Sequence, residues 1–213
     1  MGKQKQLTIY VVRHGQAEFN VKRMFGGTYE PNPLTAKGEE QALMLAKKLQ
    51  NIKLDKIYSS DLSRARKTAE IIASQHSLLV ETTKLLRERS WGSLQGKTFE
   101  EARREYAEMF AKEREMSGDE AFVFKYVEDM ESLEEAISRF KQFLKTVIDS
   151  QLSKTILVVS HFDIMMGYLI DMGFGTYHEL MNATWAHTGY FKLVKNEGIF
   201  IVEKITGLSI KSH

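Results

Sequence analysis

Cysteine is absent from this chain of 213 residues, and proline occurs only as Pro31 and Pro33, both in one loop. Without cysteine there is neither a disulfide nor a thiolate zinc site, which fits a reducing compartment. No apolar run approaches the roughly 20 residues that span a bilayer, and the polar N-terminus MGKQKQ lacks the apolar core of a signal peptide. We therefore expect a cytoplasmic protein with no membrane partner.

An excess of charge of one sign is also missing. The chain has 30 basic and 28 acidic side chains and a formal net charge of +2, so no global field attracts nucleic acid. The length and the 43% hydrophobic content suit one globular domain. We expect residues 1–213 to form that domain as a monomer or homodimer, with a small insertion at about residues 98–131 and a small molecule as its partner.

What the chain does contain is a series of apolar strand segments that alternate with helices. LTIYVV (7–12), DKIYSS (55–60) and TILVVS (155–160) are short and rich in β-branched residues. Uniformly apolar strands of this kind are covered on both faces of a mostly parallel sheet. The pattern predicts an α/β fold, a three-layer sandwich whose central, mostly parallel sheet is flanked by helices.

Weaker signals complete the predicted order of elements. A further strand is predicted near residues 78–80, and segments 189–194 and 199–205 predict a hairpin that turns at 196–198. TFEE (98–101) has the spacing of a capping box, in which the first and fourth side chains cap a helix start.

Polar side chains follow two of the apolar strands at the point where each strand ends. Arg13 and His14 follow the first strand, and His161 follows TILVVS. Ligands bind at the carboxyl ends of the strands in such sheets, so these side chains are placed for a ligand rather than for a core.

A third strand leads to a similar position. Asp61 follows DKIYSS and is the predicted N-cap of the next helix. Arg64 then lies in the first turn, where free N–H groups and the helix dipole favour an anion. Arginine also offers planar, fixed-charge donors that match phosphate oxygens. A lone histidine or arginine in such a place is more often structural, but together these residues predict a phosphate site.

Six stretches of the chain, in this order, resemble the histidine phosphatase superfamily, which includes phosphoglycerate mutases and many phosphatases. They span most of residues 7–161 and read RHGQAEFN, PLTAKGEEQA, YSSDLSRARKTAEII, LLRERSWGSLQGKTFEE, ESLEEAISRFKQFL and ILVVSH. The resemblance implies a phosphoglycerate mutase-like fold and places the chain in the phosphatase branch.

By this resemblance, His14 is the nucleophile that becomes phosphohistidine, with its far ring nitrogen held by a backbone carbonyl, that of Gly15. Arg13, Arg64 and His161 would hold the phosphoryl oxygens and stabilise the transition state.

The resemblance also implies roles for two further residues. Asn20 matches a position that adds a polar contact to the substrate. Glu88 matches the acid that protonates the leaving alkoxide and then activates water, and a carboxyl beside a phosphate should have a raised pKa. No metal and no cofactor is implied.

Four residues near these motifs bear on the substrate. Phe162 and Asp163 stand where the family usually has glycines; Phe162 is expected to narrow the pocket and Asp163 to cap the next helix. Trp91 is expected to shield the acid or stack on the substrate. Arg89 would meet a second anionic group of the substrate, unless it is a solvated surface charge.

The segment 113–131 separates two readings of the reaction. Mutases carry a basic pair downstream for the substrate carboxylate, but Arg103 and Arg104 come too early for it, and 113–131 holds seven acids against two cations. An acidic lid over the pocket suits a larger or less anionic substrate, although the segment also reads as a solvated connector.

We therefore expect a metal-independent phosphomonoester hydrolase that acts on a small phosphorylated metabolite, either a sugar phosphate or a broad set of esters. A cofactor-dependent phosphoglycerate mutase is one alternative. A non-catalytic protein that binds phosphorylated ligands is another. Near the C-terminus, Asn182 or His187 would line the rim of the pocket, but packing by Trp185 is the preferred reading of that segment.

Overall fold

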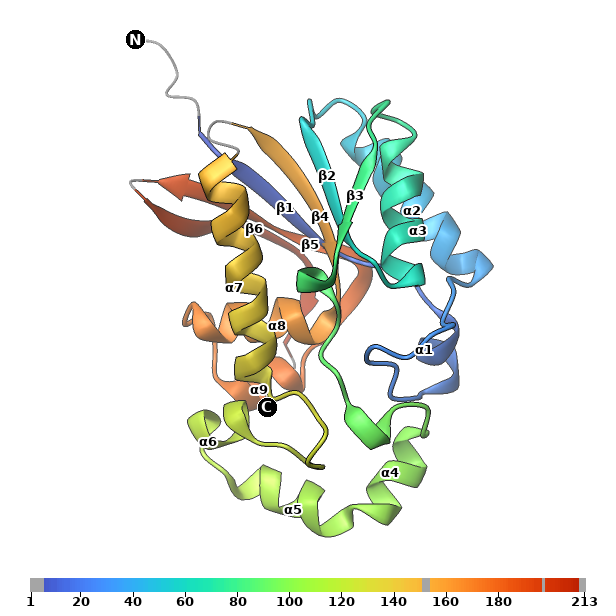
Figure 1. The fold of residues 1–213 in the computed structure, drawn as a ribbon, viewed down its shortest axis with the longest axis vertical. Helices are drawn as coiled ribbons and strands as arrows, with labels where there is room; N and C mark the ends of the chain where they lie inside the picture. Colours follow the sequence, from blue (N-terminus) through green and yellow to red (C-terminus); the bar gives the residue numbers. More distant parts are fainter. Residues whose placement is uncertain (1–5, 151–153, 197, 211–213) are drawn as a thin grey trace.

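The computed structural model describes residues 6–150, 154–196 and 198–210. Its centre is a six-stranded sheet in the order β3-β2-β4-β1-β5-β6 (Figure 1). The strands are β1 (Thr8–Arg13), β2 (Lys56–Ser60), β3 (Val80–Thr83), β4 (Thr155–Ser160), β5 (Thr184–Asn196) and β6 (Ile199–Ser209). The first four strands pair in parallel, while β5 and β6 are antiparallel. The predicted mostly parallel sheet is confirmed.

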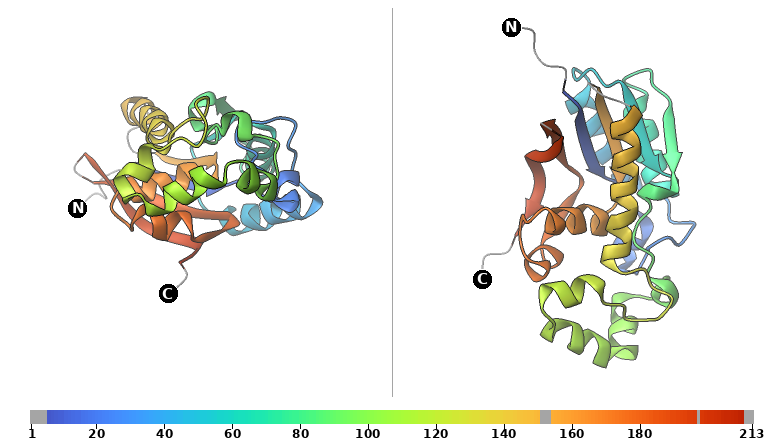
Figure 2. Two further views of the ribbon diagram at one scale, coloured as in Figure 1. Left: turned by 90° about the horizontal axis from the view of Figure 1, so that it is seen from below. Right: turned by 60° about the vertical axis from the view of Figure 1, so that its left-hand side comes forward.

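Helices cover both faces of this sheet. On one face lie α2 (Ala36–Leu49) and α3 (Ser63–Ala73), and on the other lie α7 (Leu133–Ser150) and α8 (Phe162–Asp171), as Figures 1 and 2 show. The alternation of side chains along a strand explains the two cores. Val12 of β1 packs with α2 and α3, whereas its neighbour Val11 packs with α7 and α8. The expected three-layer sandwich is therefore observed.

Three further helices form an arc beyond the carboxyl ends of the parallel strands (Figure 1). They are α4 (Phe99–Glu105), α5 (Ala107–Glu115) and α6 (Gly118–Val123). The capping box at Thr98 and Glu101 is present as predicted. A small apolar cluster that includes Phe25, Leu94 and Tyr126 lies between this arc and the strand ends. We call residues 98–131 the helical segment.

Shorter elements connect these parts of the fold. They are α1 (Glu18–Lys22), the 3-10 turns η1 (Lys84–Leu86) and η2 (Gly92–Leu94), and α9 (Tyr177–Met181). Among the described residues, no helix has the length and apolar character needed to cross a membrane. Residues 1–5 of the polar N-terminus MGKQKQ lie outside the described residues. So does residue 197, the middle residue of the turn predicted at 196–198.

Two expectations about helix starts were wrong. Asp61 does not cap α3, which begins at Ser63 with Leu62 at the N-cap. Its two carboxylate oxygens instead accept hydrogen bonds from Arg87 at 2.7 Å each, and this bidentate pair is stronger than a single cap bond. Asp163 does not cap α8 either: the N-cap is His161, and Asp163 is a buried residue of the first turn.

Candidate active site

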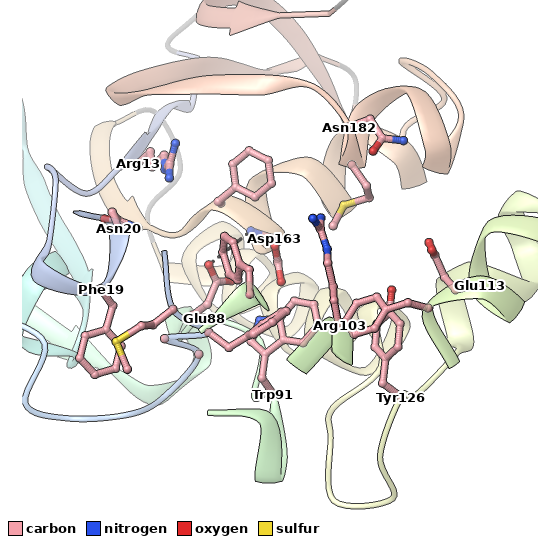
Figure 3. A pocket seen from close by; sticks show the side chains of 18 of the residues that line it. Arg13, Phe19, Asn20, Glu88, Trp91, Arg103, Glu113, Tyr126, Asp163 and Asn182 are labelled. Carbon is pink, nitrogen blue, oxygen red and sulfur yellow. Dashed lines mark hydrogen bonds between the residues drawn. The ribbon is translucent and has the colours of Figure 1, made fainter. Parts of the chain in front are cut away.

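A cavity of about 500 Å³ opens at the carboxyl ends of β1 and β4, between the sheet and the helical segment. Figure 3 shows side chains from several separate parts of the chain pointing into it. Its inner end, as we name it, is formed by Arg13, His14, Arg64 and Glu88. Its outer wall is formed mainly by aromatic residues and by cations of the helical segment. The end of β1, the start of α3 and the loop that carries Glu88 therefore meet at one place.

His14 is held in a defined tautomer at the inner end. Its ring is 3% exposed, and its Nδ1–H donates to the carbonyl of Gly15 over 2.7 Å. Burial, together with Arg64 and Arg13, holds the pKa of His14 well below 6.5, so the ring is neutral at pH 7. With the proton on Nδ1, Nε2 keeps its lone pair, which accepts a hydrogen bond from Nε of Arg64 in this structure and is the atom suited to attack on phosphorus.

Gly15 is required by close backbone packing at the same place. A Cβ at this position would overlap the backbone carbonyl oxygen of Gly38, at the start of α2. The tight approach lets the chain turn directly after β1 while the carbonyl of Gly15 faces the ring of His14.

Two buried guanidiniums flank His14. Nε of Arg64 lies 3.3 Å from Nε2 of His14, and its Nη2 donates to the carbonyl of Gly27 over 2.7 Å. Arg13 donates to the carbonyl of Trp185. Burial lowers the pKa of Arg13 to about 10, so it is still a cation at neutral pH.

Both guanidiniums keep buried N–H donors that make no hydrogen bond to the described part of the chain, although Nη1 of Arg64 forms an ion pair with Oε1 of Glu30 at 3.7 Å. Nη1 of Arg64 and Nε of Arg13 are buried and make no hydrogen bond to any described residue. Buried donors in native structures are nearly always satisfied, so these atoms are suited to an anionic ligand.

His161 lies directly behind His14. Its ring centroid is 5.1 Å from that of His14, it is fully buried, and both of its ring nitrogens lack a partner among the described residues. Burial, with Arg64 and His14, holds the pKa of His161 well below 6.5. The neutral ring has an N–H donor without a partner among the described residues, but His161 is not among the residues that line the cavity.

Glu88 completes the inner end, opposite the guanidiniums. It is 8% exposed, and its Oε1 accepts a hydrogen bond from the backbone N–H of Arg89 over 3.0 Å. Burial and the neighbouring Asp163 carboxylate raise the pKa of Glu88. A carboxyl that keeps its proton near neutral pH is suited to general-acid chemistry.

Comparison with known proteins agrees with this geometry. The sequence profile of the histidine phosphatase superfamily (branch 1) matches residues 9–203. This chain belongs to that superfamily.

Individual superfamily members differ in their named activities. The chain is 33% identical to the "Probable phosphoglycerate mutase GpmB" of Escherichia coli O1:K1 / APEC over 165 residues, which cover 78% of this chain and 74% of the relative. Its fold matches YhfR of Bacillus stearothermophilus with a TM-score of 0.83 and 25% identity, over 94% and 96% of the two chains. It also matches a mycobacterial glucosyl-3-phosphoglycerate phosphatase with a TM-score of 0.79 and 19% identity, over 92% and 96%.

The remaining substrate-binding candidates divide between the cavity and the core. Asn20, Trp91 and Phe162 line the cavity, and the guanidinium of Arg13 lies 5.0 Å from the ring centroid of Phe162. Arg89 is not among the lining residues, and at 1% exposure it is no surface charge either.

Arg89 instead supports the cavity wall from behind. Its Nε donates to the carbonyl of Glu131 over 3.1 Å, and its guanidinium lies 4.5 Å from the ring centroid of Trp91. Its contacts are with the protein interior, with the ring of Trp91 and with the sulfur of Met130.

Superfamily motifs do not include the cations of the outer wall, and sequence reasoning missed them. Arg103 and Arg114 both line the cavity, and of the seven acids in 113–131 only Glu113 does so. The segment 113–131 therefore lies at the cavity as expected, through Glu113, Arg114 and Tyr126, but the face that it presents there is not predominantly acidic. Phe99 and Arg103 are four residues apart and share the cavity face of α4, a spacing that was visible in the sequence.

His187 was noted in the sequence only as a rim candidate. Its ring centroid lies 6.1 Å from that of His14, and the ring interacts with the backbone of His14. A bulge in β5, where the register jumps between Trp185 and Tyr190, brings it there. The preferred reading of Trp185 also holds, since the ring is 2% exposed and its N–H donates to the carbonyl of Thr206 over 2.7 Å.

Two further observations concern the rim of the cavity and groups able to hold a metal ion. Asn182 lines the cavity. Among the described residues there is no group of three or more His, Asp or Glu side chains able to hold a metal ion.

Proposed function

We propose that this protein is a metal-independent phosphomonoester hydrolase that works through a phosphohistidine on His14. The observation that carries the proposal is the state of the His14 ring. Its Nδ1–H donates to the Gly15 carbonyl, and its Nε2 keeps a lone pair that accepts a hydrogen bond from Nε of the buried Arg64 guanidinium, a bond that has to give way when a phosphoryl group binds. A neutral, oriented imidazole next to fixed positive charge is what nucleophilic attack on a phosphate dianion requires.

The reaction proceeds in two balanced steps. First, Nε2 of His14 forms a bond to phosphorus while the bond to the leaving oxygen breaks, and Glu88 gives its proton to that oxygen. Then water attacks the phosphohistidine, Glu88 takes a proton from the water, and the phosphorus–nitrogen bond breaks to release inorganic phosphate. Arg13 and Arg64 neutralise charge on the phosphoryl oxygens throughout.

Support for hydrolysis over phosphoryl transfer comes from the size and lining of the cavity. At about 500 Å³, it has room for a leaving group well beyond a three-carbon acid. Aromatic side chains such as Phe25, Trp91, Phe110 and Tyr126 form much of its wall. A wall of this kind favours an ester with an apolar or planar part and leaves space for water beside the phosphohistidine.

The mutase alternative is favoured by two other observations. The curated relative carries a mutase name, and Arg103 and Arg114 give the outer wall the cations that a substrate carboxylate requires. A third alternative, a non-catalytic binding protein, requires only the inner end without turnover.

A panel of substrates separates the three. We expect release of inorganic phosphate from p-nitrophenyl phosphate and from sugar phosphates, and none of this activity in His14→Ala. Turnover of 3-phosphoglycerate that depends on 2,3-bisphosphoglycerate and exceeds every hydrolytic rate would replace hydrolysis by the mutase reaction. Binding of phosphate without any turnover would establish the non-catalytic alternative.

A further inference from the structure

A second carboxyl lies beside Glu88 in the cavity. Asp163, in the first turn of α8, is 6% exposed and lines the same cavity, as Figure 3 shows. Its backbone N–H lies 3.4 Å from Oε2 of Glu88, so the two residues are held together. Its Oδ2 is buried and makes no hydrogen bond to any described residue.

We propose that Asp163 is a positioning residue that keeps the proton on Glu88 until the leaving group takes it. The inference rests on the proposed function, in which Glu88 is the proton donor. It adds a residue that the superfamily motifs do not supply, because glycines are usual at this position.

The contacts of the two carboxyls decide which of them is charged. Two like charges in one buried site do not both ionise. Burial raises the pKa of Asp163 too, but Arg89, Arg13 and the side chain of Trp91 all favour its ionised form and oppose that rise. An aspartate also starts from the lower ordinary pKa, so Asp163 ionises first, and its charge then opposes ionisation of Glu88.

The other charged and titratable groups around the pair do not reverse this order. Arg64 and two backbone N–H groups favour the ionised form of Glu88, but burial and the charge of Asp163 outweigh them. Tyr126 and Tyr177 face Asp163 from the helical segment and from α9, and burial raises the pKa of Tyr177 to about 12. Burial raises the pKa of Tyr126 as well, so both phenols stay neutral over the working range.

The chemical consequence concerns only the proton. Glu88 carries it into the first step, gives it to the leaving oxygen as the bond to phosphorus breaks, and recovers one from water in the second step. Asp163 makes and breaks no bond. Its charge makes the uncharged form of Glu88 the resting form, and this matters most for alkoxide leaving groups, which depart only when protonated.

The direct test is a titration of Glu88 by carbon-13 NMR of protein labelled at the glutamate carboxyls, with the Glu88 signal assigned by its loss in Glu88→Gln. Asp163→Asn removes the charge at nearly constant size, and we expect the midpoint of Glu88 to fall by about one pH unit or more. Asp171→Asn is the matched control on the same helix, because Asp171 pairs at the surface with Lys141, and it should leave the midpoint in place. An unchanged or higher midpoint in Asp163→Asn would overturn the proposal.

Kinetics give a second readout. In Asp163→Asn the alkaline limb of the pH profile of kcat should move to lower pH. At pH 8, kcat should fall about tenfold for an alkyl phosphate. It should fall much less for p-nitrophenyl phosphate, whose leaving group needs little protonation. Equal losses on both esters would contradict the proposal. If Asp163→Asn does not fold, Asp163→Ser serves the same tests. Absence of turnover in the unmodified protein would refute the proposed hydrolase, while the NMR titration would still decide the pairing of the two carboxyls.

Discussion

The two ends of the cavity are built in different ways. At the inner end, Arg13, His14 and Arg64 come from the end of one strand and the start of one helix, and the rings and guanidiniums there are buried and fixed by backbone carbonyls. On the outer wall, Arg103 and Arg114 come from the short helices α4 and α5 and are solvent-exposed at the edge of the cavity. Fixed charge suits the common chemistry of a phosphoryl group, whereas adaptable side chains suit recognition of what is attached to it. The comparison predicts that substitutions at the inner end lower the rate with every substrate, whereas substitutions on the outer wall lower it only with some substrates.

The largest effect is expected for Arg64→Ala. Loss of this guanidinium should lower kcat by about 100-fold to 1000-fold on every phosphomonoester, because it removes charge stabilisation at the transferring group. Arg66→Ala is the control on the same helix, since Arg66 is exposed and pairs with the exposed Glu70. Steady-state kinetics on at least three esters would test this, and a loss confined to one ester would erase the distinction between the two ends.

The inner end should also set how stability depends on acid. His14 and His161 are neutral when folded, with pKa values well below 6.5, so the unfolded chain binds more protons as the pH falls below about 7. The contribution of these two histidines to the free energy of unfolding therefore decreases as the pH falls from about 7 to about 5. In His161→Asn this loss should be smaller by about 1–2 kcal/mol in urea unfolding. An identical loss in both proteins would show that His161 is not held neutral by the fold.

A smaller and selective effect is expected on the outer wall. Arg103→Ala should lower kcat/KM by about tenfold for carboxyphenyl phosphate, which carries a second anion, but hardly at all for phenyl phosphate. Arg104→Ala is the matched control, because Arg104 is exposed and is not among the cavity-lining residues. An equal loss on both esters would mean that Arg103 supports the site rather than reads the substrate.

A further prediction concerns the stability cost of burying Glu88. Its pKa is raised in the folded protein, so the folded state loses stability as the pH rises above the ordinary value of about 4.5. Because the folded pKa of Glu88 is about 8, Glu88→Gln removes this loss, and its stability relative to the unmodified protein should increase by about 3 kcal/mol between pH 5 and pH 8. A difference in the free energy of unfolding that stays constant across this range would show that burial does not raise the pKa of Glu88.

Local patterns predicted much of the framework. Apolar, β-branched runs predict β1, β2 and β4 because a strand that is buried on both faces is apolar along its whole length. The capping box predicts the start of α4 because its two partners, Thr98 and Glu101, are only three residues apart. The strand predicted near residues 78–80 lies a few residues before the observed β3 (Val80–Thr83), because β3 is short and half-buried at the edge of the sheet and has only a weak local pattern. Its position depends on pairing with β2, which no local pattern records.

Predictions for single charged side chains were less successful. Asp61 and Asp163 both stood where a cap was expected, yet one binds Arg87 and the other is buried beside Glu88. Arg89 was weighed as a substrate contact or a surface charge and is neither, because Trp91 and Glu131 enclose it. A charged side chain takes the partner that the fold brings closest, and that partner is often distant in sequence.

The amino-acid sequence by itself determined the alternation of strands and helices and the polar residues at the strand ends, because periodicity and chain order are properties of short segments. Only the tertiary structure decided that Arg103 faces the cavity, that His187 reaches His14 through a bulge, and that a second carboxyl lies beside Glu88. These facts depend on how distant segments pack, and burial then sets the charge of each group by what surrounds it.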